Sequence, residues 1–409
     1  MGAWSDFWRL HHAARALAKH DALIPREYLN GLPLSLRMAR RLLGTRERDD
    51  KIAPPGVRLA AALENLGPAY IKLGQVLATR PDLIGPDIAH ALETLQDRLP
   101  PFPTEDAKKQ IEASLLKPVA DLYSSLSDPV AAASIAQVHV GETTDEVSKK
   151  VAVKVLRPGI AQEFAKDLSA FAFAARMAER YSAEARRLRL RAVVDTLALS
   201  VALELDLRME GAAASELAEN TKNDRDFRVP AIDWNRTAGH VLTSEWIDGT
   251  PIRDPKDVEA AGHDPKRIAV VVVQSFLTQA LRDGFFHADL HPGNLFVDGE
   301  GRLVAVDFGI MGRLDPAMRR FLAETLGGFL ARDYMRVAEV HYGAGFVPRS
   351  HPIETFAQAL RAVGEPIFGR TARDVSMAKL LAQLFDTTYL FYMQAQPQLI
   401  LLQKTMVVV

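Results

Sequence analysis

The sequence predicts an α+β fold with two lobes, the first rich in strands and the second mostly helical. Residues 150–156 alternate apolar and polar side chains as a strand does, and the pattern stops at Arg157-Pro158-Gly159. Further strand patterns cover 227–246, and from 248 onward the periodicity is helical except for a strand-like block at 287–310. The chain of 409 residues exceeds one typical domain, and its 48% hydrophobic content is ample for two cores.

The chain is expected to have four segments. They are a basic amphipathic extension at 1–50, a helical region at 51–118, the strand-rich lobe at 119–247 and the helical lobe at 248–409. Within the strand-rich lobe we expect helices at 160–182 and 187–219. The last residues form an apolar run without a cap or a polar tail, which indicates a helix interrupted at Val409.

Composition excludes several classes of function. The formal net charge of −1 offers no global reason for a nucleic-acid partner. The chain contains no cysteine, so disulfides, zinc–thiolate sites and a cysteine nucleophile are excluded. No signal peptide is recognisable, and no run of about 18 apolar residues predicts a membrane-spanning helix.

The N-terminal extension combines aromatic and basic residues at helical spacing. These are Trp4, Phe7 and Trp8 with Arg9, Arg15 and Lys19, followed by a second basic cluster of Arg37, Arg40 and Arg41. One interpretation is a basic amphipathic surface that lies on anionic lipid. The other is a helix that packs its aromatic side chains on the body of the protein, and both stay open at this point.

Two motifs in the second lobe indicate phosphoryl chemistry. Residues 287–294 read HADLHPGN and residues 306–309 read VDFG, in the order in which protein kinases carry H-R-D-L-x-x-x-N and D-F-G. Magnesium prefers hard oxygen ligands and neutralises the transferred phosphate. Asn294 and Asp307 are therefore predicted to hold Mg²⁺, and Asp289 to orient or deprotonate the attacking hydroxyl or water. A D-F-G alone would indicate only a tight turn.

A lysine and an acidic partner are expected in the first lobe. Residues 151–154 read VAVK, like the kinase strand whose lysine contacts the α- and β-phosphates of the nucleotide, here ATP or ADP. The segment that follows offers three acids, Glu204, Asp206 and Glu210. We assign Glu210 as the ion-pair partner of Lys154, although a solvated helix face would explain any one of these acids alone.

The expected phosphate loop departs from the kinase pattern. No G-x-G-x-x-G precedes the lysine strand, and the residues in its place are Ala131, Ala132, Ala133 and Ser134. Alanine methyl groups limit close approach to phosphates, whereas Ser134 can donate to one. A helix start or a packed turn is the alternative. No A-P-E follows the D-F-G, and Asp315 with Pro316 predicts a helix start instead, which favours a small-molecule or water acceptor.

These departures together resemble the UbiB family of atypical kinases. Residues 64–82 read ENLGPAYIKLGQVLATRPD, which is similar to the family's K-x-G-Q signature, and the alanine-rich loop, the E-x-D element and the H-x-D-x-H-P-G-N block are further family features. The resemblance covers roughly residues 55–315. It implies a bilobal protein-kinase-like fold with an N-terminal helical K-x-G-Q extension. It also implies that Lys72 and Gln75 face the nucleotide pocket, with Glu204 and Asp206 close by.

The resemblance also implies a function. Family members use ATP or ADP with Mg²⁺ as ATPases or atypical kinases in ubiquinone biosynthesis, so the expected partners are ubiquinone precursors or other ubiquinone-biosynthesis proteins, with anionic membrane lipids and no nucleic acid. The expected location is the cytoplasmic face of the inner membrane, with C-terminal membrane helices beyond Val409. Two other functions stay open: a small-molecule kinase of the aminoglycoside or choline kinase type, and a nucleotide-gated lipid-binding scaffold without turnover.

Overall fold

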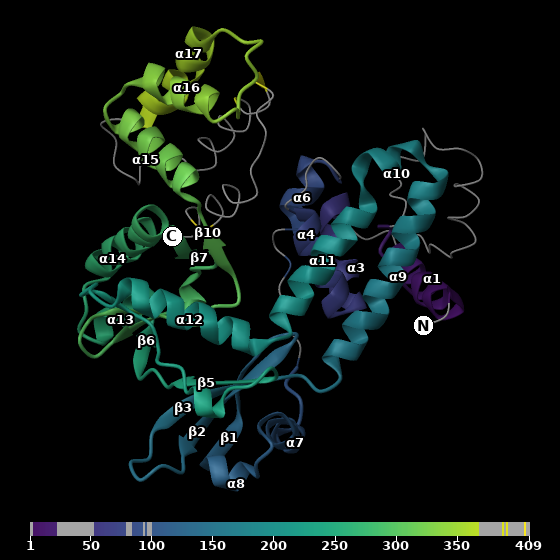
Figure 1. Cartoon of the computed structure of the whole chain (residues 1–409), viewed down its shortest axis with the longest axis vertical. Helices are drawn as coiled ribbons and strands as arrows, with labels where there is room; N and C mark the ends of the chain where they lie inside the picture. Colours follow the sequence, from purple (N-terminus) through teal and green to yellow (C-terminus); the bar gives the residue numbers. More distant parts are fainter. Residues whose placement is uncertain are drawn as a thin grey trace. The chain divides into compact units, whose positions relative to one another are not determined.

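The structure is a computed structural model that describes residues 3–22, 53–78, 84–92, 95 and 100–367, with the single positions 387, 390, 391 and 405. It divides into two compact units (Figure 1). Unit 1 comprises residues 1–211 and 232–246, and unit 2 comprises 212–231 and 247–409. The second basic cluster, with Arg37, Arg40 and Arg41, lies outside the described residues, as does most of the C-terminal run. The segment limits expected at 50, 118 and 247 stay predictions.

Unit 1 contains a four-stranded antiparallel sheet in the order β1-β2-β3-β5. Its strands are β1 (Tyr123–Ala132), β2 (Ala136–Thr143), β3 (Lys150–Leu156) and β5 (Val241–Glu245). The predicted strand at 150–156 is therefore confirmed. Alternation along β3 buries Val153 and Val155 in a core with Ile111 of α7 (Thr104–Leu115). The same alternation turns Lys154 to the opposite face of the sheet.

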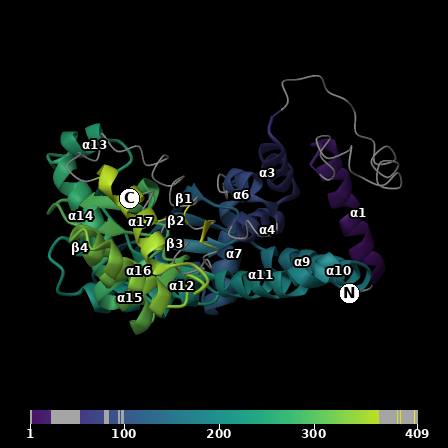
Figure 2. The same ribbon diagram turned by 90° about the horizontal axis from the view of Figure 1, so that it is seen from above.

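A second core of unit 1 is built from helices. They are α1 (Ala3–Lys19), α3 (Pro55–Leu66), α4 (Pro68–Ala78), α6 (Pro86–Leu92), α9 (Ile160–Tyr181) and α11 (Leu190–Glu204), and the short α10 (Ala183–Leu188) connects α9 to α11. Tyr70 and Ile71 of the K-x-G-Q helix α4 are buried in this core beside Phe171 of α9 and Leu197 of α11. Figure 2 shows α9 and α11 lying alongside each other. The burial of Tyr70 and Ile71 in this core thus determines the orientation of α4, and with it the position of Lys72.

The helical stretches expected at 160–182 and 187–219 are both found, the first as α9 and the second with breaks that the sequence pattern does not indicate. That stretch is broken into α10, α11 and α12 (Leu207–Thr221). The last break has a clear cause, since the Asp206 carboxylate accepts from the Arg208 N–H at 3.1 Å and caps the start of α12. Helical periodicity continues through the break, so hydrophobic pattern alone does not reveal it.

Unit 2 contains short strands and helices. The sheet order is β4-β9-β8-β6, and β7 pairs with β10. The strands are β4 (Phe227–Arg228), β6 (Gly249–Pro251), β7 (Phe285–His287), β8 (Leu295–Asp298), β9 (Leu303–Ala305) and β10 (Met311–Arg313). The helices are α13 (Pro255–Ala260), α14 (Pro265–Thr278), α15 (Pro316–Leu330), α16 (Tyr334–Gly343) and α17 (Ile353–Gly364). The strands of the 287–310 block frame the loops that carry the two motifs.

The expected start of α15 is confirmed. Asp315 precedes Pro316, and its carboxylate accepts from the Met318 N–H at 2.7 Å. Among the described helices, none combines the length and the apolar character that crossing a lipid bilayer requires.

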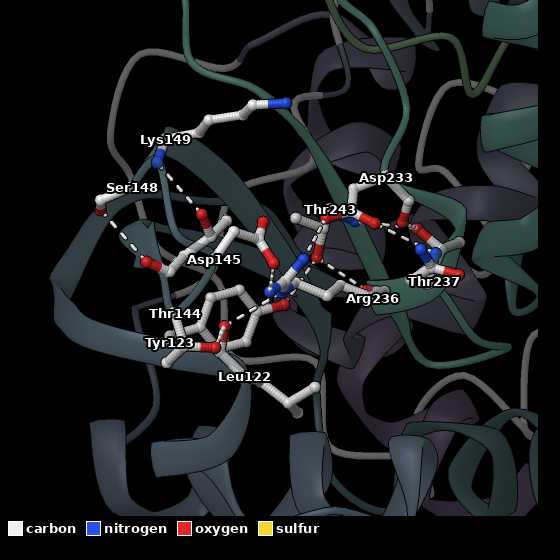
Figure 3. A network of polar contacts seen from close by, with 12 residues as sticks. Leu122, Tyr123, Thr144, Asp145, Ser148, Lys149, Asp233, Arg236, Thr237 and Thr243 are labelled. Carbon is white, nitrogen blue, oxygen red and sulfur yellow. Dashed lines mark hydrogen bonds and ion pairs between the residues drawn. The ribbon is translucent and has the colours of Figure 1, made fainter.

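A polar network fixes the start of β1 (Figure 3). The buried guanidinium of Arg236 donates to Asp233 and to Asp145, each at 2.8 Å, and the Tyr123 hydroxyl lies 2.7 Å from the Thr243 hydroxyl of β5. Burial raises the pKa of Tyr123 to about 12, so this hydroxyl keeps its proton. The network therefore fixes the end of β1 that is opposite to the alanine-rich turn.

A buried histidine lies near this turn on β2. His139 Nδ1 is 2.7 Å from the Ser127 carbonyl, which only accepts, so Nδ1 carries the proton. His139 Nε2 then accepts from the Gln137 amide at 2.9 Å. The remaining groups of that amide bind the N–H and the C=O of Phe102. The imidazole must therefore stay neutral, and burial lowers its pKa from 6.5.

We predict that His139 makes the stability of unit 1 depend on pH. The folded pKa is lower than 6.5, so the stabilising contribution is complete above that pH and is lost as the pH falls toward the folded value. Urea unfolding at about pH 7.5 and about pH 5.5 measures the loss of unfolding free energy. His139→Gln should show a smaller loss than the parent. The other buried histidines, His287 and His341, contribute equally to both proteins. Equal losses would contradict the prediction.

Candidate active site

Lys154 and Glu210 form a close ion pair in unit 1. The Lys154 ammonium lies 2.8 Å and 2.9 Å from the two carboxylate oxygens of Glu210. The lysine comes from β3 and the glutamate from the first turn of α12, which passes close to β5. A Cβ at Gly211 would lie 3.1 Å from the Leu242 side chain and 3.2 Å from Trp234. Glycine at 211 thus lets α12 approach the sheet.

A second ion pair involves the K-x-G-Q helix. The Lys72 ammonium is 2.7 Å from Glu204, the last residue of α11, and both side chains are largely buried. Glu204 also accepts from the Ser200 hydroxyl at 3.3 Å. Gln75 is half-buried one turn further along α4. The structure therefore brings Lys72 and Glu204 together, as the family resemblance implies, and their contact with a nucleotide stays a prediction.

Asp206 has a different local partner. Its carboxylate forms two hydrogen bonds with the Arg208 guanidinium, at 2.9 Å and 2.6 Å, besides capping α12. These hydrogen bonds hold the pKa of Asp206 below its usual value. Asp206 is therefore ionised and caps the N-terminus of α12. A role of Asp206 in nucleotide binding stays a prediction.

The alanine-rich segment forms the turn of a β-hairpin. Ala131 and Ala132 end β1, and the Ala133 N–H donates to the Ala136 carbonyl at 2.8 Å. The alternative of a helix start is therefore wrong. Ser134 is 1% exposed, and its hydroxyl finds no hydrogen-bond partner among the described residues. An unsatisfied buried hydroxyl costs roughly 1–3 kcal/mol, so this group is suited to a ligand oxygen.

In unit 2, one imidazole joins the two motif loops. His287 Nδ1 accepts from the Asp289 N–H at 3.1 Å, and Nε2 lies 3.3 Å from the Val306 carbonyl, to which it donates. His287 is fully buried, and burial lowers its pKa below the usual value. The ring is therefore neutral, which the acceptor role of Nδ1 requires. It positions the main chain on which Asp289 and Asp307 stand.

Contacts around these two loops also orient Asn294 and Asp307, the magnesium ligands expected from the sequence. The Asn294 side-chain amide donates to the Asp289 carbonyl at 3.2 Å, which leaves its Oδ1 as the oxygen for a cation. Asp307 has a left-handed φ of 63°, rare for a residue other than glycine, and Phe308 beside it is buried against His287. Amide and carboxylate oxygens are ligands that Mg²⁺ accepts, so the residues present fit this ion.

The sequence does not predict one contact of the loop at 288–294. The Thr405 hydroxyl donates to the Ala288 carbonyl at 2.9 Å, directly before Asp289, and Thr405 is fully buried. No sequence motif marks this threonine, which follows Gln403 and Lys404 in the last residues of the chain. It is a further residue that stabilises the loop.

Comparison with known proteins finds two domain matches. Residues 94–341 match the ABC1 atypical kinase-like domain, and residues 360–409 match the UbiB helical domain. Two relatives named probable protein kinase UbiB come from Marinobacter nauticus, 45% identical over 356 residues, and from Azotobacter vinelandii, 43% identical over 358 residues. Each alignment covers 86% of this chain, which spans only 65% and 66% of those relatives' lengths.

A solved structure shows the same fold. The Rv3197–erythromycin complex from Mycobacterium tuberculosis aligns with a TM-score of 0.51 and 24% identity, over 91% of this chain and 93% of that chain. The domain matches and this structural similarity confirm the α+β, protein-kinase-like fold class expected from the sequence.

We predict that Glu204→Gln lowers the free energy of unfolding by about 2 kcal/mol, because it leaves the buried Lys72 ammonium without a counter-charge. The double variant Lys72→Met/Glu204→Gln should recover most of this loss. Glu105→Gln is the matched control, since it breaks the exposed pair with Lys108 and should cost less than about 0.5 kcal/mol. Denaturant titration measures all three. A loss for Glu204→Gln as small as that of the control would contradict the prediction.

Proposed function

The chain belongs to the UbiB family of atypical kinase-like proteins, and from this premise we propose that it is a magnesium-dependent ATPase or atypical kinase that supports ubiquinone biosynthesis. The observation that carries the proposal is the arrangement of the loops at 288–294 and 306–309. There, His287 and Asn294 hold the main chain at Asp289, and Asn294 and Asp307 carry amide and carboxylate oxygens of the kind that Mg²⁺ accepts. Relatives named as probable protein kinases support the same chemistry.

Each residue has a proposed role. Lys154, whose ammonium is oriented by Glu210, contacts the α- and β-phosphates of ATP or ADP. Asn294 and Asp307 hold Mg²⁺, which when bound neutralises negative charge on the phosphate oxygens. Asp289 accepts the proton of the attacking hydroxyl or water. The Ser134 hydroxyl of the alanine-rich turn donates to a phosphate oxygen.

We infer a small-molecule or water acceptor. After Asp307 the chain runs through the three residues of β10 and enters α15 at Pro316, which leaves little length for a segment that docks a peptide. Phenolic or lipid intermediates of ubiquinone synthesis are the proposed acceptors or regulators. The K-x-G-Q motif and the family matches disfavour an aminoglycoside or choline kinase. A nucleotide-gated scaffold without turnover is the second candidate, and catalysis must be measured to separate the two.

The test is phosphate release from Mg²⁺ and ATP, with and without a phenol and liposomes. We predict that Asp307→Asn lowers turnover by at least about 100-fold, because it removes a charged metal ligand. The exposed Asp257 of α13 supplies the matched control, Asp257→Asn, which should match the parent. If the parent binds nucleotide without releasing phosphate under any of these conditions, the scaffold replaces the ATPase as the proposed function.

We also propose that α1 lies on anionic lipid at the cytoplasmic face of the inner membrane. The helix packs on the body through Asp6, Ala13 and Ala18, which are buried. Two polar contacts to α9 add to this packing, from Arg9 to Asp167 and from Ser169 to Asp6. Its aromatic side chains stay exposed, with Trp4 at 73%, Phe7 at 50% and Trp8 at 54%. Exposed aromatic residues beside basic ones favour a lipid interface over packing on the body.

We predict that Trp4→Ser/Trp8→Ser weakens binding to phosphatidylglycerol vesicles by about tenfold or more. The variant lacks the two aromatic side chains that enter the lipid interface in the proposed complex. Vesicle co-sedimentation at low salt measures the affinity. Leu199→Ser is the matched control, since Leu199 is an exposed apolar residue on α11 of the same unit, and it should bind like the parent. Equal binding of the tryptophan variant and the control would refute the proposal for α1.

A further inference from the structure

One arginine ties the alanine-rich turn to the segment that leads into α7. Arg157 follows β3 directly, and its main-chain N–H donates to the Ile135 carbonyl at 2.7 Å. Its guanidinium donates from Nε to the Ser134 carbonyl at 3.2 Å and from Nη2 to the Pro100 carbonyl at 2.7 Å. The same group lies 5.2 Å from the centre of the Phe102 ring. Arg157 therefore contacts both sides of this junction at once.

A second link reinforces the first. The buried Gln137 follows the turn in β2, and its amide binds the N–H and the C=O of Phe102, at 2.8 Å and 3.1 Å. Arg157 thus bonds to the main chain of both the turn and the segment at 100–102, and Gln137, directly after the turn in the chain, bonds to the main chain of Phe102. The turn and the segment are therefore expected to move together.

The same segment is close in sequence to a contact of the K-x-G-Q helix. A Cβ at Gly74 of α4 would lie 2.4 Å from Leu95 Cδ1, so Leu95 packs directly on this glycine, and Pro100 lies five residues further along the chain. Leu95 belongs to the helical core of unit 1, and Ile135 of the turn packs against that core as well. Leu95 thus contacts the K-x-G-Q helix, and Ile135 joins the turn to the same helical core.

We propose that Arg157 is a positioning residue that couples the K-x-G-Q helix to the alanine-rich turn. A displacement of α4 shifts the helical core against which Leu95 and Ile135 pack, and Arg157, which bonds to the main chain of Ile135, Ser134 and Pro100, passes the shift through the turn. The chemistry requires arginine, because only the planar guanidinium donates to two separate carbonyls while it stacks on a ring. The coupling does not depend on the proposed catalysis. Its consequence for nucleotide affinity rests on the proposed function.

The first test is hydrogen exchange of the nucleotide-free chain. In Arg157→Met, the amide of Phe102 and the amides at 130–137 should exchange about tenfold faster, because hydrogen bonds from a charged donor are lost. The exchange rates of Arg157→Lys should lie between those of the parent and those of Arg157→Met, since lysine keeps the positive charge but lacks the planar set of donors of the guanidinium. The amides of β5 should not change, nor should any segment of unit 1 in the exposed control Arg349→Met. Unchanged exchange in the turn would overturn the proposal. If Arg157→Met fails to fold, Arg157→Lys decides the result.

The second test isolates the coupling. Gly74→Ala presses on Leu95 and should alter exchange at 130–137 in the parent background. In the Arg157→Met background the same substitution should have less than about a third of that effect on the turn, by the logic of a double-mutant cycle. An equal effect in both backgrounds would overturn the proposal, because the signal would then not pass through Arg157.

The third test links the coupling to the nucleotide. In Arg157→Met, the ratio of the dissociation constants for ATP and ADP should change by about threefold or more, with partial rescue in Arg157→Lys and no change in Arg349→Met. Uniform weakening of both nucleotides would mean that Arg157 only stabilises the fold, and it would overturn the proposed role. If the parent binds neither nucleotide, the proposed function fails, and the two exchange tests still decide the coupling.

Discussion

A neutral, fully buried imidazole holds together the two loops that carry the acidic and amide residues of unit 2. His287 accepts from the Asp289 N–H and donates to the Val306 carbonyl, so the ring needs one unprotonated and one protonated nitrogen. A protonated ring would turn the acceptor into a donor and break the bond to the loop of Asp289. Burial lowers the pKa of His287 and thereby keeps the required form. The positions of Asn294 and Asp307 depend on this arrangement, since Val306 also donates to the Asn294 carbonyl.

In unit 1, a helix break distributes neighbouring acids among different cations. Glu204 ends α11 and pairs with Lys72 of α4, whereas Glu210 in α12 pairs with Lys154 of β3. Asp206 lies between them, caps α12 and binds Arg208. One short segment thus neutralises the buried Lys72 and the partly buried Lys154, which come from distant parts of the chain. This arrangement explains why the segment is rich in acids without forming a solvated helix face.

The sequence predicts those features that depend on short-range pattern and known motif spacing. The strand at 150–156, the helix at 160–182 and the cap at Asp315 follow from periodicity and capping chemistry. The choice of Glu210 beside Lys154 follows from the kinase motif order and not from local chemistry, which does not distinguish the three acids. The break at Asp206 escaped prediction because helical periodicity runs through it, and only tertiary packing of α12 on β5 shows where the helix must restart.

Other contacts lie beyond sequence reasoning because their acceptors are main-chain oxygens. Arg157 and Thr405 donate to the carbonyls of Ser134, Pro100 and Ala288, and a carbonyl is present at every position, so no residue type identifies it. The sequence also does not determine how α1 packs on the body of the protein. The sequence shows two possible faces of the helix, and only the buried Asp6 and its partners on α9 show which face contacts the body.

The alanine-rich turn differs from a glycine-rich loop in how it can meet a phosphate. Glycine-rich loops offer their main-chain N–H groups to the ligand. Here the Ala133 N–H is used inside the turn, and the carbonyls of Ser134 and Ile135 accept from Arg157. These bonds hold the main chain of the turn to its surroundings. The Ser134 hydroxyl is a buried side-chain group that the described structure leaves unsatisfied there. A phosphate at this turn would therefore meet a side-chain hydroxyl on a turn held in place by residues outside it, and the position of that hydroxyl would depend on the elements that hold the turn.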